Sequence, residues 1–181
     1  MQPDDLRMSV YASLMASLIA VGAYLMVPLG PVPVVLQNLF VLLAGLLLGG
    51  RWGLVSVGIY LLVGAMGLPV FAEGKGGIAH LVGPRGGYLF GFAAAAYMAG
   101  MLSERGRSRM HVDVVAVVIG TLVVYACGIP WLKMQTGMSW QKALTVGMIP
   151  FLVPDAVKAV AAVLLAKALR PLLKRKLGVA S

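Results

Sequence analysis

Long apolar runs, separated by glycine, proline and charged residues, constrain this chain more than any other feature of its sequence. A helix needs about 20 apolar residues to cross the hydrocarbon core of a membrane. The chain has 181 residues, and at roughly 30 residues per span and connection this leaves room for about six such helices. We predict spans over residues 8–27, 34–49, 53–67, 87–102, 112–129 and 143–172.

The composition excludes an ordinary soluble domain. Hydrophobic residues make up 60% of the chain and charged residues only 12%, whereas soluble domains carry about 25% charged residues. The expected fold class is therefore all-α, with residues 1–181 forming a single membrane domain of six transmembrane helices. The apolar run that begins at Met8 is too long for a signal peptide, so it is predicted to be the first of these helices.

The distribution of lysine and arginine predicts the orientation, because these residues accumulate in cytoplasmic loops. With both termini cytoplasmic, ten of the 15 cations fall on the cytoplasmic side and four on the other, and Lys158 lies inside a span. We therefore expect both termini in the cytoplasm, and external connections over residues 29–33, 69–86 and 130–142. The net charge of +9 is then explained by orientation, and no nucleic-acid binding is expected.

Two charges are not explained by orientation. Asp155 and Lys158 lie in the last predicted span, and their spacing of three places both side chains on one face of a helix. Each ionised group costs about 2.5–3.5 kcal/mol at membrane depth. The pair either only packs the bundle or binds a ligand that carries both donors and acceptors, and we favour the ligand.

Other polar residues stand at the entrances of predicted spans. Gln37 and Asn38 open the second span and Tyr88 opens the fourth. Buried amides and phenols need hydrogen-bond partners, so each of these residues either caps its helix or faces a ligand. Taken singly, the capping interpretation is favoured.

Small residues recur every four positions in the first span, at Ala12, Ala16 and Ala20. Such a face lets two helix backbones approach closely in lipid. Packing within the bundle is its usual explanation, and contact with another membrane subunit is the competing one.

Catalytic and metal-binding motifs are missing from the sequence. It has no phosphate-binding loop and no His-Glu-x-x-His zinc motif, and no Gly-x-Ser-x-Gly nucleophile elbow. Its one cysteine, Cys127, can form no intrachain disulfide. We therefore expect no catalytic residue, no metal and no cofactor.

Four stretches, taken together, resemble the signature of a known family. Residues 30–45, 67–72, 83–92 and 154–158 are similar, in the same order, to stretches of the BioY family, the biotin-specific S components of energy-coupling factor (ECF) transporters. The resemblance implies a six-helix protein of the prokaryotic plasma membrane that captures biotin from outside. It would deliver biotin inward with a transmembrane coupling subunit and two ABC-type ATPase subunits as partners.

The resemblance also implies functional residues. Biotin contacts are expected at Tyr88, Asp155 and Lys158, with Gly77 contributing its backbone and with Gln37 and Asn38 as further candidates. The face of Ala12, Ala16 and Ala20 resembles the motif by which S components dock on the coupling subunit. The sequence departs from the family pattern at Val35 and Asn38, where threonine is common, and at Arg85, which replaces a smaller residue.

Three other functions compete with a biotin S component. The first is an S component for another vitamin, such as a thiamine precursor. The second is an intramembrane enzyme that uses Asp155 as acid or base, and the third is a purely structural membrane subunit.

Overall fold

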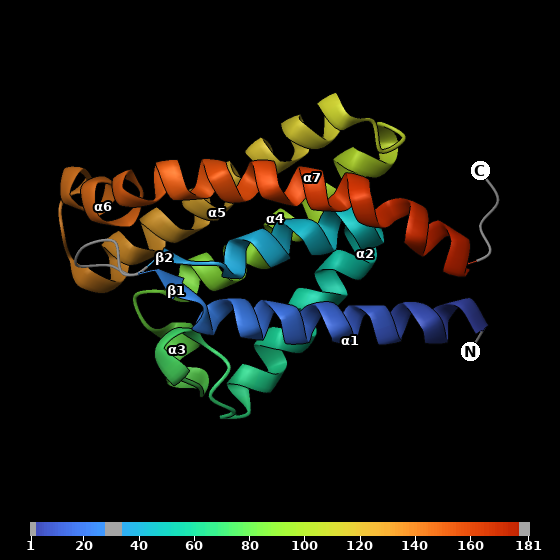
Figure 1. The fold of residues 1–181 in the computed structure, drawn as a ribbon. Helices are drawn as coiled ribbons and strands as arrows, with labels where there is room; N and C mark the ends of the chain where they lie inside the picture. Colours follow the sequence, from blue (N-terminus) through green and yellow to red (C-terminus); the bar gives the residue numbers. More distant parts are fainter. Residues whose placement is uncertain (1–2, 28–33, 178–181) are drawn as a thin grey trace.

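The structure of the protein, a computed structural model, describes residues 3–27 and 34–177. The predicted connection 29–33 lies outside the described residues. Seven α-helices are labelled in Figure 1: α1 (Pro3–Tyr24), α2 (Gln37–Ala65), α3 (Ile78–Val82), α4 (Gly86–Arg105), α5 (Met110–Thr136), α6 (Trp140–Gly147) and α7 (Leu152–Leu177). Two 3-10 turns, η1 (Ala72–Gly74) and η2 (Ile149–Phe151), and a short antiparallel pair of strands, β1 (Met26–Val27) and β2 (Val34–Val35), complete the described elements.

The helices have the length and apolarity of membrane spans. Four segments of the described chain are long and apolar enough to cross a membrane, and these are Asp5–Tyr24, Gln37–Ala65, Met110–Thr136 and Trp140–Leu173. The predicted all-helical membrane protein is thereby confirmed at this level. Helix α4 contains the predicted span 87–102 but is not one of the four. Helix α4 is rich in glycine and alanine, which lower its hydropathy but allow neighbouring helices to approach closely. It packs between α2 and α5.

Helix α2 is interrupted at Gly49, where the chain turns back on itself (Figure 1). Gly49 has φ 82°, a left-handed conformation that glycine adopts without steric cost. The two halves then pack closely, since a Cβ atom on Gly53 would lie 2.8 Å from the Cα of Gly45. The carboxylate of Glu104 accepts a hydrogen bond from the N–H of Gly50 at 3.3 Å. The predicted spans 34–49 and 53–67 thus correspond to the two halves of α2.

Two predicted boundaries differ from the structure. Helix α5 continues through Pro130 to Thr136, although the sequence predicts that the span ends at residue 129. Proline is tolerated in such helices because their surroundings can satisfy the freed carbonyl. The predicted span 143–172 is divided among α6, η2 and α7, because the helix breaks at Met148, two residues before Pro150.

Helix α1 begins and α7 ends at the same end of the bundle (Figure 1). A buried ionic cluster links α5 and α7 near this end. The Asp113 carboxylate on α5 pairs with the Arg170 guanidinium on α7, and their side chains are only 2% and 13% exposed. Asp113 also accepts from the Ser103 hydroxyl at 2.5 Å, and Arg170 donates to the Leu46 carbonyl at 2.9 Å. Arg170 is counted among the cytoplasmic loop charges when the orientation is predicted, but it is a buried link among α2, α4, α5 and α7.

The opposite end of the bundle has a different construction. The starts of α2, α4 and α7 meet there with the last turns of α5, and α3, α6 and the two strands close it off (Figure 1). Polar residues at helix starts are therefore gathered at this end. This arrangement positions the candidate site.

Candidate ligand-binding site

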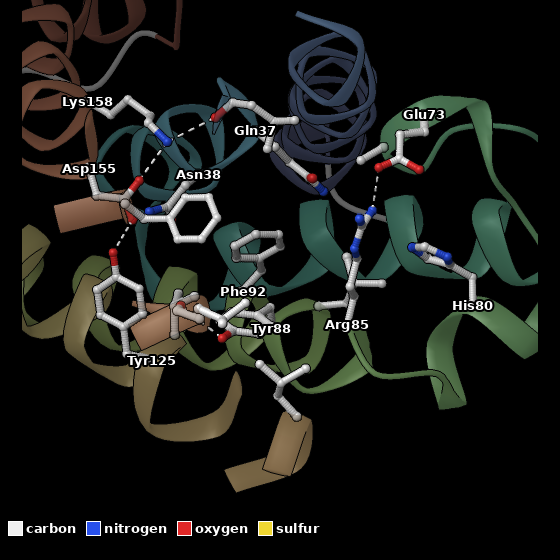
Figure 2. A pocket seen from close by; sticks show the side chains of 18 residues that line it. Gln37, Asn38, Glu73, His80, Arg85, Tyr88, Phe92, Tyr125, Asp155 and Lys158 are labelled. Atoms are coloured by element: carbon white, nitrogen blue, oxygen red, sulfur yellow. Dashed lines mark hydrogen bonds and ion pairs between the residues drawn. The ribbon is translucent and has the colours of Figure 1, made fainter. Parts of the chain in front are cut away.

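A cavity of about 290 Å³ lies at this end of the bundle, close to the lower limit of the roughly 300–1,000 Å³ typical of small-molecule sites. Its apolar walls come mainly from α4, α5, α6 and η2, and they include Leu89, Phe92, Val124, Leu132, Val146 and Phe151. Most of its polar side chains form two groups at opposite sides of the cavity, with Phe92 and Tyr88 between them (Figure 2). We call these groups the deep end (Asn38, Tyr125, Asp155 and Lys158) and the mouth (Glu73, His80 and Arg85).

The deep end is built around the Asp155–Lys158 pair. Lys158 Nζ lies 2.6 Å from Asp155 Oδ1, and the two side chains are only 6% and 9% exposed. The Tyr125 hydroxyl donates to Asp155 Oδ2 at 2.5 Å, and Lys158 Nζ also donates to the Val35 carbonyl at 2.9 Å. Asp155 lies in the first turn of α7, where the helix dipole favours a negative charge.

The pair keeps unused bonding capacity that faces the cavity. An ammonium group has three N–H donors and a carboxylate has about four acceptor positions. The described contacts use two of the donors on Lys158 and two of the acceptor positions on Asp155. Because both side chains line the cavity, the pair can accept from one ligand group and donate to another.

Asn38 adds an acceptor without a partner. Its Oδ1 atom is buried and has no hydrogen-bond partner among the described residues, and the residue lines the cavity. A buried acceptor left unpaired costs about 1–3 kcal/mol, so an N–H from a ligand would relieve that cost. Its neighbour Gln37 also lines the cavity, but its amide is engaged, donating to the Tyr60 hydroxyl at 2.6 Å.

Tyr88 presents its ring to the middle of the cavity. Its hydroxyl donates to the Gly147 carbonyl of α6 at 2.9 Å. A Cβ on Gly128 would lie 2.3 Å from the Tyr88 ring, so the glycine makes room for the ring between α4 and α5. With its hydroxyl occupied, Tyr88 offers mainly an aromatic surface to a ligand.

The mouth carries a second, more exposed set of charges. Glu73 pairs with Arg85 and with Lys75, each at 2.8 Å. Hydrogen bonds from Lys75 and Arg85 lower the pKa of the Glu73 carboxyl to about 2. Burial, together with the positive charges of Arg85 and Lys75, lowers the pKa of His80 below its usual value. At pH 7 the His80 imidazole is therefore neutral, and the mouth together with the adjacent Lys75 carries a net positive charge.

The structure brings most of the predicted ligand contacts together. Gln37, Asn38, Tyr88, Asp155 and Lys158 all line this cavity. Gly77 does not. It lies at the start of α3 with φ 91°, and its N–H donates to the Gly64 carbonyl at 2.7 Å. The expected backbone contribution of Gly77 is thus not supported by its position and stays an untested prediction.

The predicted docking face of the first helix points into the bundle. Ala12 is fully buried, Ala16 is 5% exposed and Ala20 is partly buried against the core. The small side chains with more exposure on α1 are those of Ser13 and Ser17. In the described conformation the three alanines therefore pack within the bundle, and their proposed docking on another subunit stays untested.

The polar cavity residues Tyr125, Glu73 and His80 are not among the ligand contacts predicted from the sequence. Tyr125 stands in a uniformly apolar run, and the available signal was that a phenol at membrane depth needs a hydrogen-bond partner. Glu73 and His80 belong to a glycine-rich connection whose path is set by tertiary contacts.

Comparison with known proteins identifies the family. The family model described as "BioY family" matches residues 1–175. This chain belongs to the BioY family. Among its BioY relatives, a probable biotin transporter from Pyrococcus horikoshii is 45% identical over 158 residues, which cover 87% of this chain and 93% of the relative. The biotin transporter BioY of Thermotoga maritima is 43% identical over 167 residues, which cover 92% and 98%.

A solved structure supports the same BioY fold. The crystal structure at 2.1 Å of the S-component for biotin from an ECF-type ABC transporter superposes with a TM-score of 0.85 and 28% identity. The similarity covers 94% of each chain. The cavity of this BioY chain therefore lies in a fold that an S component for biotin also adopts.

Proposed function

We propose that this chain is the biotin-binding S component of an ECF-type vitamin transporter. It captures biotin from outside the cell and delivers it inward with a transmembrane coupling subunit and two ABC-type ATPase subunits. Its similarity to BioY biotin transporters and to a crystallised S component for biotin supports this function. The chain serves transport and is not an enzyme, which agrees with its family.

The observation that carries the proposal is the cavity with two different polar ends. Biotin has a ureido group with two N–H donors and a carbonyl, an apolar fused ring, and a carboxylate at the end of its tail. The deep end offers acceptors on Asp155 and Asn38 and a donor on Lys158, which complements a ureido group. The mouth offers Arg85, whose guanidinium suits a carboxylate.

The charges favour this orientation of the ligand over the reverse. Lys158 is already neutralised by Asp155 at 2.6 Å, so a ligand carboxylate there would face Asp155 in a buried setting. At the mouth, Arg85 and the adjacent Lys75 supply two cations against the single carboxylate of Glu73. We therefore propose that the ureido group lies at the deep end, with its carbonyl toward Lys158, and that the tail extends past Tyr88 and Phe92.

We further propose a topology with six membrane crossings in the plasma membrane of a prokaryotic cell. The two halves of α2 serve as separate crossings joined at Gly49, together with α1, α4, α5 and α7, within a single domain. The excess of lysine and arginine supports a cytoplasmic location for both termini. The cavity then lies at the outer end of the bundle, where biotin arrives.

Docking on the coupling subunit is proposed to involve α1. If Ala12, Ala16 and Ala20 form the contact, α1 must rotate or separate from α2, since Ala12 and Ala16 are buried in the described conformation. Contact through the outward face of α1 requires no such movement.

The test of the function is thermal unfolding of the purified chain in detergent with biotin, thiamine or riboflavin. A ligand at 100 times its dissociation constant adds about 2.7 kcal/mol of stability, so biotin is expected to raise the unfolding temperature clearly. No shift with biotin, or a shift with another vitamin alone, would reject the proposed ligand. Covalent conversion of a ligand that is lost in Asp155→Asn would favour the enzyme alternative.

A further inference from the structure

The mouth of the cavity already contains a carboxylate. Glu73 lines the cavity, and its Oε1 atom lies 2.8 Å from Nη1 of Arg85. Its Oε2 atom lies 2.8 Å from Nζ of Lys75. Figure 2 shows the Glu73–Arg85 contact on the opposite side of the cavity from Asp155. The guanidinium that faces the cavity is thus occupied in the described structure.

The backbone holds Glu73 in this position. Glu73 has φ 64° and ψ 23°, a left-handed conformation that is uncommon for residues other than glycine. It stands in a tight turn closed by a hydrogen bond from the Phe71 N–H to the Lys75 carbonyl at 2.8 Å. The turn is attached to the bundle through the fully buried Phe71 ring, which packs edge-on against Tyr60. The carboxylate is therefore directed at the mouth by a fixed turn.

The contact is also suited to exchange. The side chains of Glu73 and Arg85 are 32% and 47% exposed, and exposed ion pairs contribute little net stability because water competes for both partners. If Glu73 releases Arg85, Lys75 still pairs with its second oxygen. The other ionisable group that faces this point in the described structure is His80, which is neutral at pH 7. Release therefore leaves no carboxylate without a cation.

We propose that Glu73 is a resident competitor for the ligand's carboxylate. In the empty site Glu73 occupies Arg85, and the carboxylate of an entering ligand displaces it and takes its place on the guanidinium. This inference rests on the proposed function, since it assumes that the ligand's carboxylate lies at the mouth. Its consequence is that Glu73 weakens binding of carboxylate ligands specifically and sets how strongly the site holds its ligand.

The test compares dissociation constants for biotin and for biotinamide, its uncharged analogue, by titration calorimetry on the purified chain. Glu73→Gln is expected to tighten biotin binding about two- to five-fold, the range that follows from the strength of an exposed ion pair. Biotinamide binding should stay unchanged. Asp5→Asn, which removes an equal charge at the far end of α1, is the matched control and should change neither constant. Glu73→Gly, with a residue suited to φ 64°, is a second variant that should repeat the gain.

A double-mutant cycle separates competition for Arg85 from general repulsion. In an Arg85→Gln background, Glu73→Gln should give no further gain for biotin. The inference is overturned if Glu73→Gln gives no gain in the wild-type background, an equal gain for biotinamide, or a gain that persists without Arg85. Absence of biotin binding by the wild-type chain would instead reject the proposed function, so the two failures are distinguishable.

Discussion

Replacing Asp155 and Lys158 singly and together tests the deep end of the cavity. Lys158 is buried, with 5% of the residue exposed. Asp155→Ala would leave its ammonium with the Val35 carbonyl as the remaining described partner. Breaking a buried ion pair from one side costs about 3–5 kcal/mol. Lys158→Ala should cost a similar amount, because Asp155 would keep the Tyr125 hydroxyl and lose its counter-charge.

The double variant leaves no unpaired charge. Its loss of unfolding free energy should therefore be smaller than the sum of the two single losses by about 1–3 kcal/mol. The assay is chemical unfolding of the purified variants in detergent. Asp5→Ala, at an exposed aspartate of α1, is the control and should cost almost nothing.

The same variants test ligand binding. A hydrogen bond to a charged group is worth about 1.5–3 kcal/mol, so loss of Asp155 should weaken biotin binding about 10- to 150-fold by calorimetry. If the loss of unfolding free energy in the double variant equals the sum of the two single losses, the interaction between Asp155 and Lys158 is refuted. Wild-type biotin affinity in Asp155→Ala would refute its place in the site.

Three other predictions concern the acceptor, the turn and the charges. Asn38→Leu should leave the free energy of unfolding unchanged or higher, because Oδ1 has no partner among the described residues. The same variant should weaken biotin binding about 2- to 12-fold, and full affinity in calorimetry would contradict a contact between Asn38 and biotin. Gly64→Ala should cost about 1–3 kcal/mol in chemical unfolding, since its Cβ would lie 2.2 Å from Phe71, while Gly58→Ala, with nothing within 4 Å, should not destabilise. Between pH 6 and 4 biotin affinity should fall, because a free carboxyl protonates near pH 4.3 while Glu73, with a pKa of about 2, stays ionised and keeps its cations. Biotinamide affinity should stay level over that range, and an equal fall for both ligands would place the titration elsewhere.

Much of the architecture could be predicted from local sequence. The apolar runs predict helices, and the turn at Gly49 falls at the end of the predicted span 34–49, because glycines and Arg51 interrupt the apolar run there. The break before α7 was missed, because Pro150 and Pro154 stand in a run whose hydropathy hides a local change of direction. At Pro130 the error is the reverse: the sequence predicts that the helix ends before this proline, but α5 continues through it.

The candidate site was predictable where a residue was unusual for its surroundings. Asp155 and Lys158 stood out because charges are costly in an apolar span, and Asn38 stood out as an amide at the start of another. Tyr125 and Glu73 could not be selected in the same way, because their roles depend on partners 30 and 12 residues away. The buried Asp113–Arg170 pair was missed because Arg170 lies close to a cluster of basic residues and resembled an ordinary loop charge.

The most direct test of the central claim is an experimental structure of this chain with biotin bound. We predict one biotin molecule in the cavity, with its ureido group beside Asn38, Asp155 and Lys158 and its carboxylate on Arg85 in place of Glu73. Biotin bound elsewhere on the chain, or in this cavity with its carboxylate against Lys158, would contradict this claim.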